Sequence, residues 1–345
     1  MRFNFATKRI VRSLLVIVTL VIVFIGGMYV RHEDDIWLGL KEPLKKLYQW
    51  SSFGKTTWNS AFEKVDIDLS NGAIQYAYFY SSSSSSKRPL LVSLHTWGGD
   101  YKEYDPLANL AYDQNLNYIH PDFYGPNNKP EACCSDQVIK AIDAAIAYAI
   151  KNGNVDPGEI YITGASGGGY ATLCMLLKST HKIKSFAAWV PVTDLEAWYY
   201  ENKIRKGNFT NDILACTSSG KTINRVNAAK RSPLQWQTNS HNLENANIAI
   251  YAGIYDGITG SVPITHAINF YNKLLKDRGV PESAPEYVND YEKSYLLEKR
   301  IPLHDLGSIS GRKVCLRKTY ENITLVIFEG GHEMLAEYNL KTLMN

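Results

Sequence analysis

The chain has 345 residues, 45% of them hydrophobic, which suits one large α/β domain with insertions or two smaller domains. This apolar content is ordinary and supports a proper hydrophobic core. The formal net charge of +3 at pH 7 indicates a nearly neutral surface, so nothing in the composition points to nucleic acid as a partner. The chain is rich in aromatic residues, with 23 Tyr and 7 Trp, which fits carbohydrate or acyl-group binding, although core packing is the simpler explanation.

An uncharged apolar run at residues 13–30 predicts a single transmembrane helix. Residues 1–12 before it carry Arg2, Lys8, Arg9 and Arg12, so we expect them to stay cytoplasmic. The rest of the chain then lies on the non-cytoplasmic side of the membrane, in a periplasmic, extracellular or lumenal space. A cleaved signal peptide is the alternative and would make the protein secreted. Because no Ala-x-Ala-like cleavage site follows the run, we favour an uncleaved signal anchor.

Five cysteines are compatible with an exported domain, since disulfides persist in oxidising compartments. Cys133 and Cys134 are adjacent and cannot easily bond to each other without strain, so either of them is a candidate partner for Cys216. Cys174 lies on the apolar face of a predicted helix and is expected to be a buried thiol. No spacing of cysteine and histidine resembles a zinc site, and we expect no metal.

The folded domain is expected to begin near residue 61, after an amphipathic connector at residues 31–60. Alternating apolar and polar residues at 62–69 and 73–80 predict two antiparallel strands joined by a hairpin turn at Asn71-Gly72. The six-serine run that follows, residues 81–86, has no core-forming power and predicts a solvated loop.

From residue 89 onward, apolar strand patterns alternate with helical patterns, which predicts a mostly parallel central sheet with helices on both faces. Two long segments, residues 193–245 and 279–311, read as irregular, and the first is interpreted as a lid-like insertion. Strands are expected at residues 89–95, 116–120, 159–163, 184–192, 247–252, 313–318 and 323–328. Helices are expected at residues 102–113, 136–151, 170–177, 263–277 and from 333 onward.

The most informative motif is Gly-Ala-Ser-Gly-Gly at residues 164–168, between a predicted buried strand and a predicted apolar helix. A Gly-x-Ser-x-Gly sequence in this setting is typical of a nucleophile elbow, which holds a serine on a strained strand-to-helix turn. Its glycines remove side chains that would crowd the backbone of the turn. Ser166 is therefore the candidate nucleophile.

A serine hydroxyl needs a base within hydrogen-bond reach and an acid that orients the base. Asp256 and His332 each follow an apolar strand pattern, and both come after Ser166 in the chain. Taken singly, Asp256 reads as a turn residue before Gly257, and His332 as a cap of the last helix. Because the three residues occur in order and each follows a strand, we predict the catalytic triad Ser166, Asp256 and His332.

An oxyanion hole needs two backbone N–H donors aimed at the developing charge. Gly167, directly after the nucleophile and at a helix N-terminus, is the first candidate. The second is expected in the segment Leu-His-Thr-Trp-Gly-Gly at residues 94–99, which looks like the His-Gly-x-Gly-Gly type of turn with Thr96 in place of the first glycine. We assign this donor to Trp97, with Thr96 as the alternative.

Four segments together resemble the α/β-hydrolase superfamily: residues 94–99, residues 164–168, residues 253–257 with Val262-Pro263, and residues 328–332. They look closest to single-domain relatives of the prolyl oligopeptidase catalytic domain, which include acetylxylan-type and feruloyl-type esterases. The resemblance implies an α/β-hydrolase fold and serine hydrolysis through an acyl-enzyme, with no cofactor. It does not fix the substrate.

A short-chain or carbohydrate acyl ester is the expected substrate, bound as a small molecule or as part of a glycan. A prolyl oligopeptidase-like peptidase is the alternative, but residues 31–60 are too few for the propeller domain of the large members. The paired glutamates of the aminopeptidase branch are also not evident in the sequence. A membrane-anchored binding module that kept the hydrolase fold but lost turnover is the third hypothesis. Trp198 and Tyr199 are candidate substrate contacts, although a packed core explains them as simply.

Overall fold

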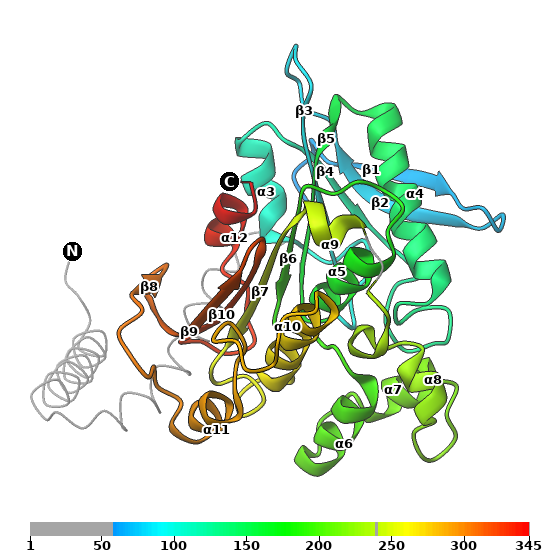
Figure 1. The fold of residues 1–345 in the computed structure, drawn as a ribbon. Coiled ribbons are helices and arrows are strands. Elements are labelled where there is room, and N and C mark those ends of the chain that lie inside the picture. Colours follow the sequence, from blue (N-terminus) through cyan, green and yellow to red (C-terminus); the bar gives the residue numbers. More distant parts are fainter. Residues whose placement is uncertain (1–57, 239–240, 345) are drawn as a thin grey trace, which may run out of the picture. The chain divides into compact units, whose positions relative to one another are not determined.

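A ten-stranded sheet forms the centre of the computed structural model, which describes residues 58–238 and 241–344 (Figure 1). In this part of the chain the strands lie in the order β1-β2-β4-β3-β5-β6-β7-β10-β9-β8. The inner strands from β4 to β10 are parallel, and the outer pairs are antiparallel. The mostly parallel sheet that the sequence predicts is therefore confirmed. The strand bounds are β1 Glu63–Asp68, β2 Ile74–Tyr80, β3 Arg88–Leu94, β4 Asn117–Pro121, β5 Val155–Ala165, β6 Ser185–Trp189, β7 Asn247–Gly253, β8 Ser308–Ile309, β9 Arg312–Tyr320 and β10 Ile323–Phe328.

The order of the strands reverses between β3 and β5, because β4 lies on one side of β3 and β5 on the other. In open α/β sheets, ligands bind in the crevice that such a reversal leaves at the carboxyl ends of the strands. Leu94 at the end of β3 pairs with Gly164 near the end of β5, and Gly253 at the end of β7 pairs with Phe328 of β10. The loops after these four strands, which carry the predicted site residues, therefore leave the sheet at one edge.

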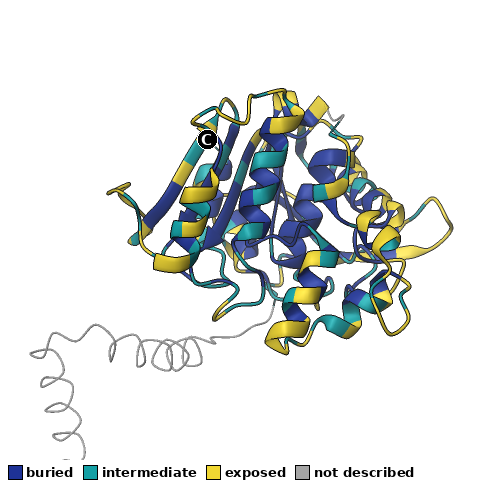
Figure 2. Cartoon of the chain, turned by 60° about the horizontal axis from the view of Figure 1, so that its bottom comes forward, coloured by how far each residue is buried: buried dark blue, intermediate teal, exposed yellow. Residues whose placement is uncertain are grey.

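Helices cover both faces of the sheet, as expected. On one face α3 and α12 contact each other and pack on β4 and β6. On the other face α4, α5 and α10 pack on the strands (Figure 1). Figure 2 shows the strands buried between these layers, with exposed residues on the outer sides of the helices. The helix bounds are α3 Pro106–Asp113, α4 Asp136–Asn152, α5 Gly167–Lys178, α10 Thr265–Asp277 and α12 Ala336–Leu343.

Local sequence explains where these helices begin. Ser135 caps α4 with a side-chain oxygen that accepts the Val138 N–H at 3.1 Å. Its apolar residues then recur at three- and four-residue steps and are buried against the sheet. Helix α3 begins later than the predicted residue 102, because Asp105 caps it by accepting the Leu107 N–H and Pro106 occupies its first turn.

The hairpin at the start of the domain is confirmed. Strands β1 and β2 pair antiparallel, with Glu63 opposite Phe79 and Asp68 opposite Ile74. Gly72 in the turn between them has a φ of 80°, a left-handed conformation that glycine adopts without strain. The serine run after β2 is a loop, and Ser82 in it is buried and donates its hydroxyl to the Asn115 side chain at 3.0 Å.

The segment 193–245 differs from the prediction, because it is largely helical rather than irregular. Four short helices and a 3₁₀ turn occupy its described part, and the first three lie below the sheet in Figure 1. They are α6 Leu195–Arg205, α7 Thr210–Cys216, α8 Arg225–Ala229, η1 Pro233–Gln235 and α9 His241–Asn245. We call the segment from α6 to α8 the helical insert. The second irregular segment likewise contains a helix, α11 Asp290–Lys299.

The predicted transmembrane helix at residues 13–30 lies outside the described residues, as does most of the connector at residues 31–60. Among the residues that the structure describes, no helix combines the length and the apolar character that crossing a membrane requires. The anchor and its orientation therefore stay predictions of the sequence.

Cys133 is the partner of Cys216, which decides between the two alternatives that the sequence left open. The bond joins the loop before α4 to the end of α7, across a separation of 83 residues. Cys174 is a free, buried cysteine as predicted, and burial raises the pKa of its thiol well above the usual value. A thiol in this setting is a packing residue rather than a nucleophile.

Loss of the disulfide should loosen the attachment of the helical insert. The double variant Cys133→Ser/Cys216→Ser is expected to lose about 2–4 kcal/mol of unfolding free energy, because the closed loop restricts the unfolded chain. Urea titration with and without a reductant checks this. The reductant should lower the midpoint of the wild type and leave the variant unchanged, and equal midpoints of wild type and variant without reductant would contradict the expectation.

Candidate active site

Ser166 lies on a strained turn between β5 and α5. Its backbone has φ 58° and ψ −114°, and φ in this region is unfavourable for a residue other than glycine. The Ser166 N–H donates to the carbonyl of Trp189 at 2.9 Å, and the Ser166 carbonyl accepts the Tyr170 N–H at 2.8 Å. The residue is thus anchored to β6 on one side and to α5 on the other. This is the geometry expected of a nucleophile elbow.

The glycines after Ser166 allow the start of α5 to touch the turn after β3. A Cβ added to Gly167 would lie 2.4 Å from the backbone nitrogen of Trp97, and one added to Gly168 would lie 2.1 Å from the Leu94 carbonyl oxygen. Both contacts are with backbone, which cannot rotate away. Glycine is therefore required at these two positions for the elbow and the turn to meet.

The meeting of these two segments brings the predicted oxyanion donors together. Within the described residues, neither the Gly167 N–H nor the Trp97 N–H has a hydrogen-bond acceptor. The Thr96 N–H is occupied, because it donates to Glu103 Oε2 at 2.7 Å. Of the two alternatives for the second donor, the geometry favours Trp97 over Thr96.

Asp256 and His332 form a close pair at the same edge of the sheet. His332 Nδ1 lies 2.7 Å from Asp256 Oδ2, and Asp256 Oδ1 accepts the N–H groups of Gly257 at 2.9 Å and Val262 at 3.0 Å. The carboxylate is buried, with 1% exposure, while the histidine side chain is 23% exposed. With Nδ1 protonated and donating to the carboxylate, Nε2 is left as an acceptor that can take a proton.

His332 Nε2 faces a hydroxyl that the sequence did not single out. Ser261 Oγ lies 3.3 Å from it, and in the described part of the chain Ser166 Oγ makes no hydrogen bond with His332. The nitrogen that would accept a proton from Ser166 is therefore engaged by Ser261 in this structure. A triad acting through Ser166 requires His332 or the side chain of Ser166 to turn, and catalytic hydrogen bonds commonly tighten only when substrate binds.

The helical insert holds the loop that carries Ser261 by hydrogen bonds from α6. Arg205, at the end of α6, donates to the carbonyls of Gly257 at 3.1 Å, Gly260 at 3.0 Å and Ser261 at 2.7 Å. Trp198, also on α6, donates its indole N–H to the Ser261 carbonyl at 2.9 Å. The insert thus holds the acid loop, residues 256–262, against the Asp256–His332 pair.

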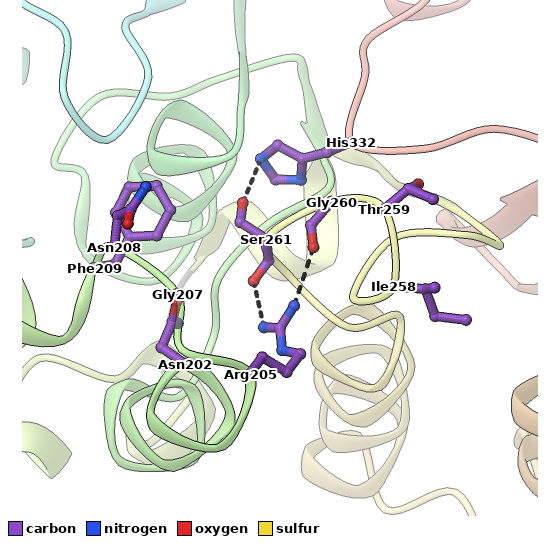
Figure 3. A pocket seen from close by; sticks show the side chains of 10 residues that line it. All are labelled: Asn202, Arg205, Gly207, Asn208, Phe209, Ile258, Thr259, Gly260, Ser261 and His332. Atoms are coloured by element: carbon purple, nitrogen blue, oxygen red, sulfur yellow. Dashed lines mark hydrogen bonds between the residues drawn. The ribbon is translucent and has the colours of Figure 1, made fainter. Parts of the chain in front are cut away.

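A hollow of about 670 Å³ lies next to His332. Figure 3 shows His332, Ser261 and Arg205 linked along it, with Asn208 and Phe209 on the opposite side from Ile258. Its lining comes from the insert, from the acid loop and from the loop after β10, and contains no carboxylate side chain. The lining residues are Asn202, Arg205, Gly207, Asn208, Phe209, Ile258, Thr259, Gly260, Ser261 and His332.

The predicted substrate contacts Trp198 and Tyr199 lie in the core, with exposures of 0% and 2%. Trp198 stacks on Phe209 at 5.0 Å and meets the edge of Trp97 at 4.7 Å between ring centroids. The Trp97 indole N–H in turn lies 3.3 Å from Asp212 Oδ2, where burial raises the pKa of the carboxyl. This burial favours the packing explanation for both residues. Of this aromatic group, Phe209 lines the hollow.

Three residues near the site escaped the sequence analysis: Ser261, Arg205 and Glu103. Arg205 contacts residues more than 50 positions away in the chain, so no local spacing reveals it. Glu103 lies seven residues after Thr96, and only the fold of the loop between them brings the two together. Ser261 lies five residues after Asp256, and only the course of the loop brings it back to His332.

Comparison with known proteins agrees with the motifs. Residues 127–287 match the model of the prolyl oligopeptidase family, Peptidase_S9. The matched region includes the elbow and Asp256, while the turn after β3 and His332 lie outside it. The resemblance to this family that the motifs predict is confirmed over these residues, which make up slightly less than half of the chain.

The individual relatives cover only part of the chain. An acetylxylan esterase of Coprinopsis cinerea is 29% identical over 128 residues, which cover 32% of this chain and 33% of that protein. Two solved structures superpose on 64% of the chain, at 17% and 15% identity, with TM-scores of 0.51 and 0.50. They are an acylaminoacyl peptidase of Pyrococcus horikoshii, of which 36% is covered, and a puromycin-hydrolysing peptidase of Mycobacterium tuberculosis, of which 35% is covered. These likenesses confirm an α/β-hydrolase-like fold, and the chain spans about a third of the length of each relative.

The two serines near His332 can be separated by substitution. Ser166→Ala should lower kcat for an ester substrate on the order of 10⁴-fold or more, because the nucleophile is lost. Ser261→Ala should keep kcat within about threefold of wild type or raise it, because it frees His332 Nε2. Steady-state hydrolysis of p-nitrophenyl acetate by both variants measures this. Loss of activity in Ser261→Ala together with retained activity in Ser166→Ala would make Ser261 the reactive hydroxyl.

Proposed function

We propose that the protein is a serine hydrolase that cleaves carboxylic esters through an acyl-enzyme intermediate. Ser166 is the nucleophile, His332 the general base and Asp256 the residue that orients the base. The observation that carries this proposal is the strained elbow at Ser166 on the same sheet edge as the Asp256–His332 pair, whose nitrogen and oxygen lie 2.7 Å apart.

In the first half of the proposed reaction, His332 Nε2 takes the proton of Ser166 as Oγ attacks the carbonyl carbon of the ester. The electron pair of the carbonyl bond moves to its oxygen, which becomes an oxyanion between the N–H groups of Trp97 and Gly167. When the tetrahedral intermediate collapses, the bond to the alcohol breaks. The imidazolium of His332 gives its proton to the leaving alcohol, which leaves an ester on Ser166.

In the second half, His332 takes a proton from a water molecule that attacks the acyl-enzyme, and the released Ser166 oxygen recovers that proton. Asp256 keeps the imidazole in the tautomer with a free Nε2 and stabilises the imidazolium in both halves. Its own position is fixed by the N–H groups of Gly257 and Val262, which hold one oxygen while the other receives His332.

A short acyl group on a carbohydrate is the proposed substrate class. The relative named acetylxylan esterase supports an ester on a sugar. The hollow beside His332 offers amide and hydroxyl groups and the half-buried ring of Phe209, and none of its lining side chains is a carboxylate that would hold a peptide amine. Peptide cleavage is the second candidate, because the matched family is one of peptidases.

We further propose that the hydrolase domain works outside the cytosol. The disulfide between Cys133 and Cys216 supports this, since such bonds persist mainly in oxidising compartments. The apolar run at residues 13–30, preceded by basic residues, supports attachment to a membrane with the domain on the non-cytoplasmic side.

A panel of substrates tests the proposed specificity. The purified full-length protein is assayed with acetylated xylo-oligosaccharides, feruloyl esters and proline-containing peptide nitroanilides, with Ser166→Ala as the control. We expect kcat/KM for the acetyl esters to exceed that for the peptides by at least about 100-fold, because a site with no carboxylate for the amine lacks a peptide anchor. Faster cleavage of the peptides would contradict the ester assignment.

A fluorophosphonate probe separates a hydrolase from a binding module that has lost turnover. The folded protein should acquire one covalent label on Ser166, because only an activated serine reacts with the probe. Mass spectrometry of the digested protein locates the label. Folded protein that stays unlabelled would favour the binding module.

A further inference from the structure

The turn after β3 is held by a carboxylate that comes from the next loop. Glu103 Oε2 accepts the Thr96 N–H at 2.7 Å, and Glu103 Oε1 accepts the Thr96 hydroxyl at 2.7 Å. Both oxygens of one carboxylate thus accept hydrogen bonds from a single residue. Hydrogen bonds to an ionised acceptor are roughly twice as strong as those between neutral groups, so this pair of bonds holds Thr96 strongly.

The two hydrogen bonds from Thr96 to Glu103 fix the direction of the peptide group between Thr96 and Trp97, which carries the Trp97 N–H. The carbonyl of that peptide, on Thr96, accepts the Gly99 N–H at 3.2 Å and lies 2.8 Å from His95 Nδ1. In a trans peptide the N–H points opposite to the carbonyl. With its carbonyl turned toward Gly99 and His95, the Thr96–Trp97 peptide directs its N–H away from them, on the side where Trp97 N meets Gly167.

Glu103 also explains two features of the motif at residues 95–99. Thr96, in place of the glycine of related turns, supplies the hydroxyl that Glu103 binds. A Cβ on Gly99 would lie 2.3 Å from Glu103 Oε2, so the carboxylate fills the space that a side chain at this position would need. Gly99 therefore has to be a glycine for the Glu103 carboxylate to reach Thr96.

We propose that Glu103 is a positioning residue of the oxyanion hole, which holds Thr96 so that the Trp97 N–H stays aimed at the reacting carbonyl. This inference rests on the proposed function. Glu103 touches neither Ser166 nor His332 in the described structure and acts through Thr96. It works by geometry and not by charge, because a carboxylate near the hole would oppose the negative charge that develops there.

Two substitutions of Glu103 separate geometry from charge. Glu103→Ala removes both acceptors and should lower kcat by about 10-fold or more, up to the roughly 10²–10³-fold that loss of one oxyanion donor costs, with KM changed less than about threefold. Glu103→Gln keeps an acceptor for the Thr96 N–H, and its amide can donate to the Thr96 hydroxyl, so kcat should stay within about fivefold of wild type. Thr96→Val, which removes only the hydroxyl bond, should lie between the two.

Binding of a transition-state mimic distinguishes a positioning role from a merely structural one, because a merely structural role would leave its inhibition constant unchanged. The inhibition constant of a phenylboronic acid, which forms a tetrahedral adduct on the serine, should weaken in Glu103→Ala by the same factor as kcat/KM. Glu337→Ala, which removes an exposed carboxylate on α12, is the matched control and should leave both values unchanged.

The inference is overturned if Glu103→Ala keeps kcat within twofold of wild type. It is also overturned if activity falls while the affinity for the boronic acid is unchanged, or if Glu103→Gln loses as much activity as Glu103→Ala. Failure of the proposed function looks different, because the wild-type protein would then hydrolyse no ester at all.

Discussion

The site depends on a backbone-to-backbone contact between the first turn of α5 and the turn after β3. Any side chain at Gly167 or Gly168 would collide with the backbone of residues 94–97, because its Cβ would lie as close as 2.1 Å to a backbone atom. The contact places the N–H groups of Gly167 and Trp97, which have no acceptor among the residues that the structure describes, beside the strained serine. It occurs where the strand order reverses, because only there do loops from neighbouring parallel strands diverge enough to leave a crevice. The same contact therefore serves the packing of the fold and the proposed chemistry.

The second half of the site is held from outside the sheet. Asp256 lies in the loop after β7, and His332 lies in the loop after β10. Arg205 and Trp198 of the helical insert hold the acid loop, which carries Asp256, by donating hydrogen bonds to its carbonyls. The insert is itself tied back to the domain by the disulfide between Cys133 and Cys216. The segment that the sequence predicts to be a lid thus holds the acid loop in place and lines the hollow beside His332. Because Arg205 and Trp198 bind the Ser261 carbonyl, movement of the insert would change the distance between His332 and Ser261.

The sequence predicts the sheet well because its signals are local, and the same local signals select the candidate triad. Buried parallel strands are continuous apolar runs, and Ser166, Asp256 and His332 each follow one of them. The buried residues of α6, Leu195, Trp198, Tyr199 and Asn202, do follow the i, i+3, i+4, i+7 spacing of an amphipathic helix. The exposed apolar side chains of Tyr200 and Ile204 blur this pattern in the sequence. The capping residue of α6, Asp194, which accepts the Glu196 N–H, was a readable signal. The roles of Ser261 and Glu103 depend on loop conformation, which composition and periodicity do not encode.

In the proposed mechanism His332 takes the proton of Ser166, although its Nε2 faces Ser261 in the free protein. The most direct measurement is a crystal structure of the protein after reaction with an alkyl phosphonate, whose adduct mimics the tetrahedral intermediate. We predict phosphorus bonded to Ser166 Oγ, His332 Nε2 turned from Ser261 toward the adduct, and a phosphonyl oxygen within hydrogen-bond distance of the Trp97 and Gly167 nitrogens. An adduct on Ser261, or one on Ser166 with His332 still bonded to Ser261 and no N–H on the phosphonyl oxygen, would contradict the account.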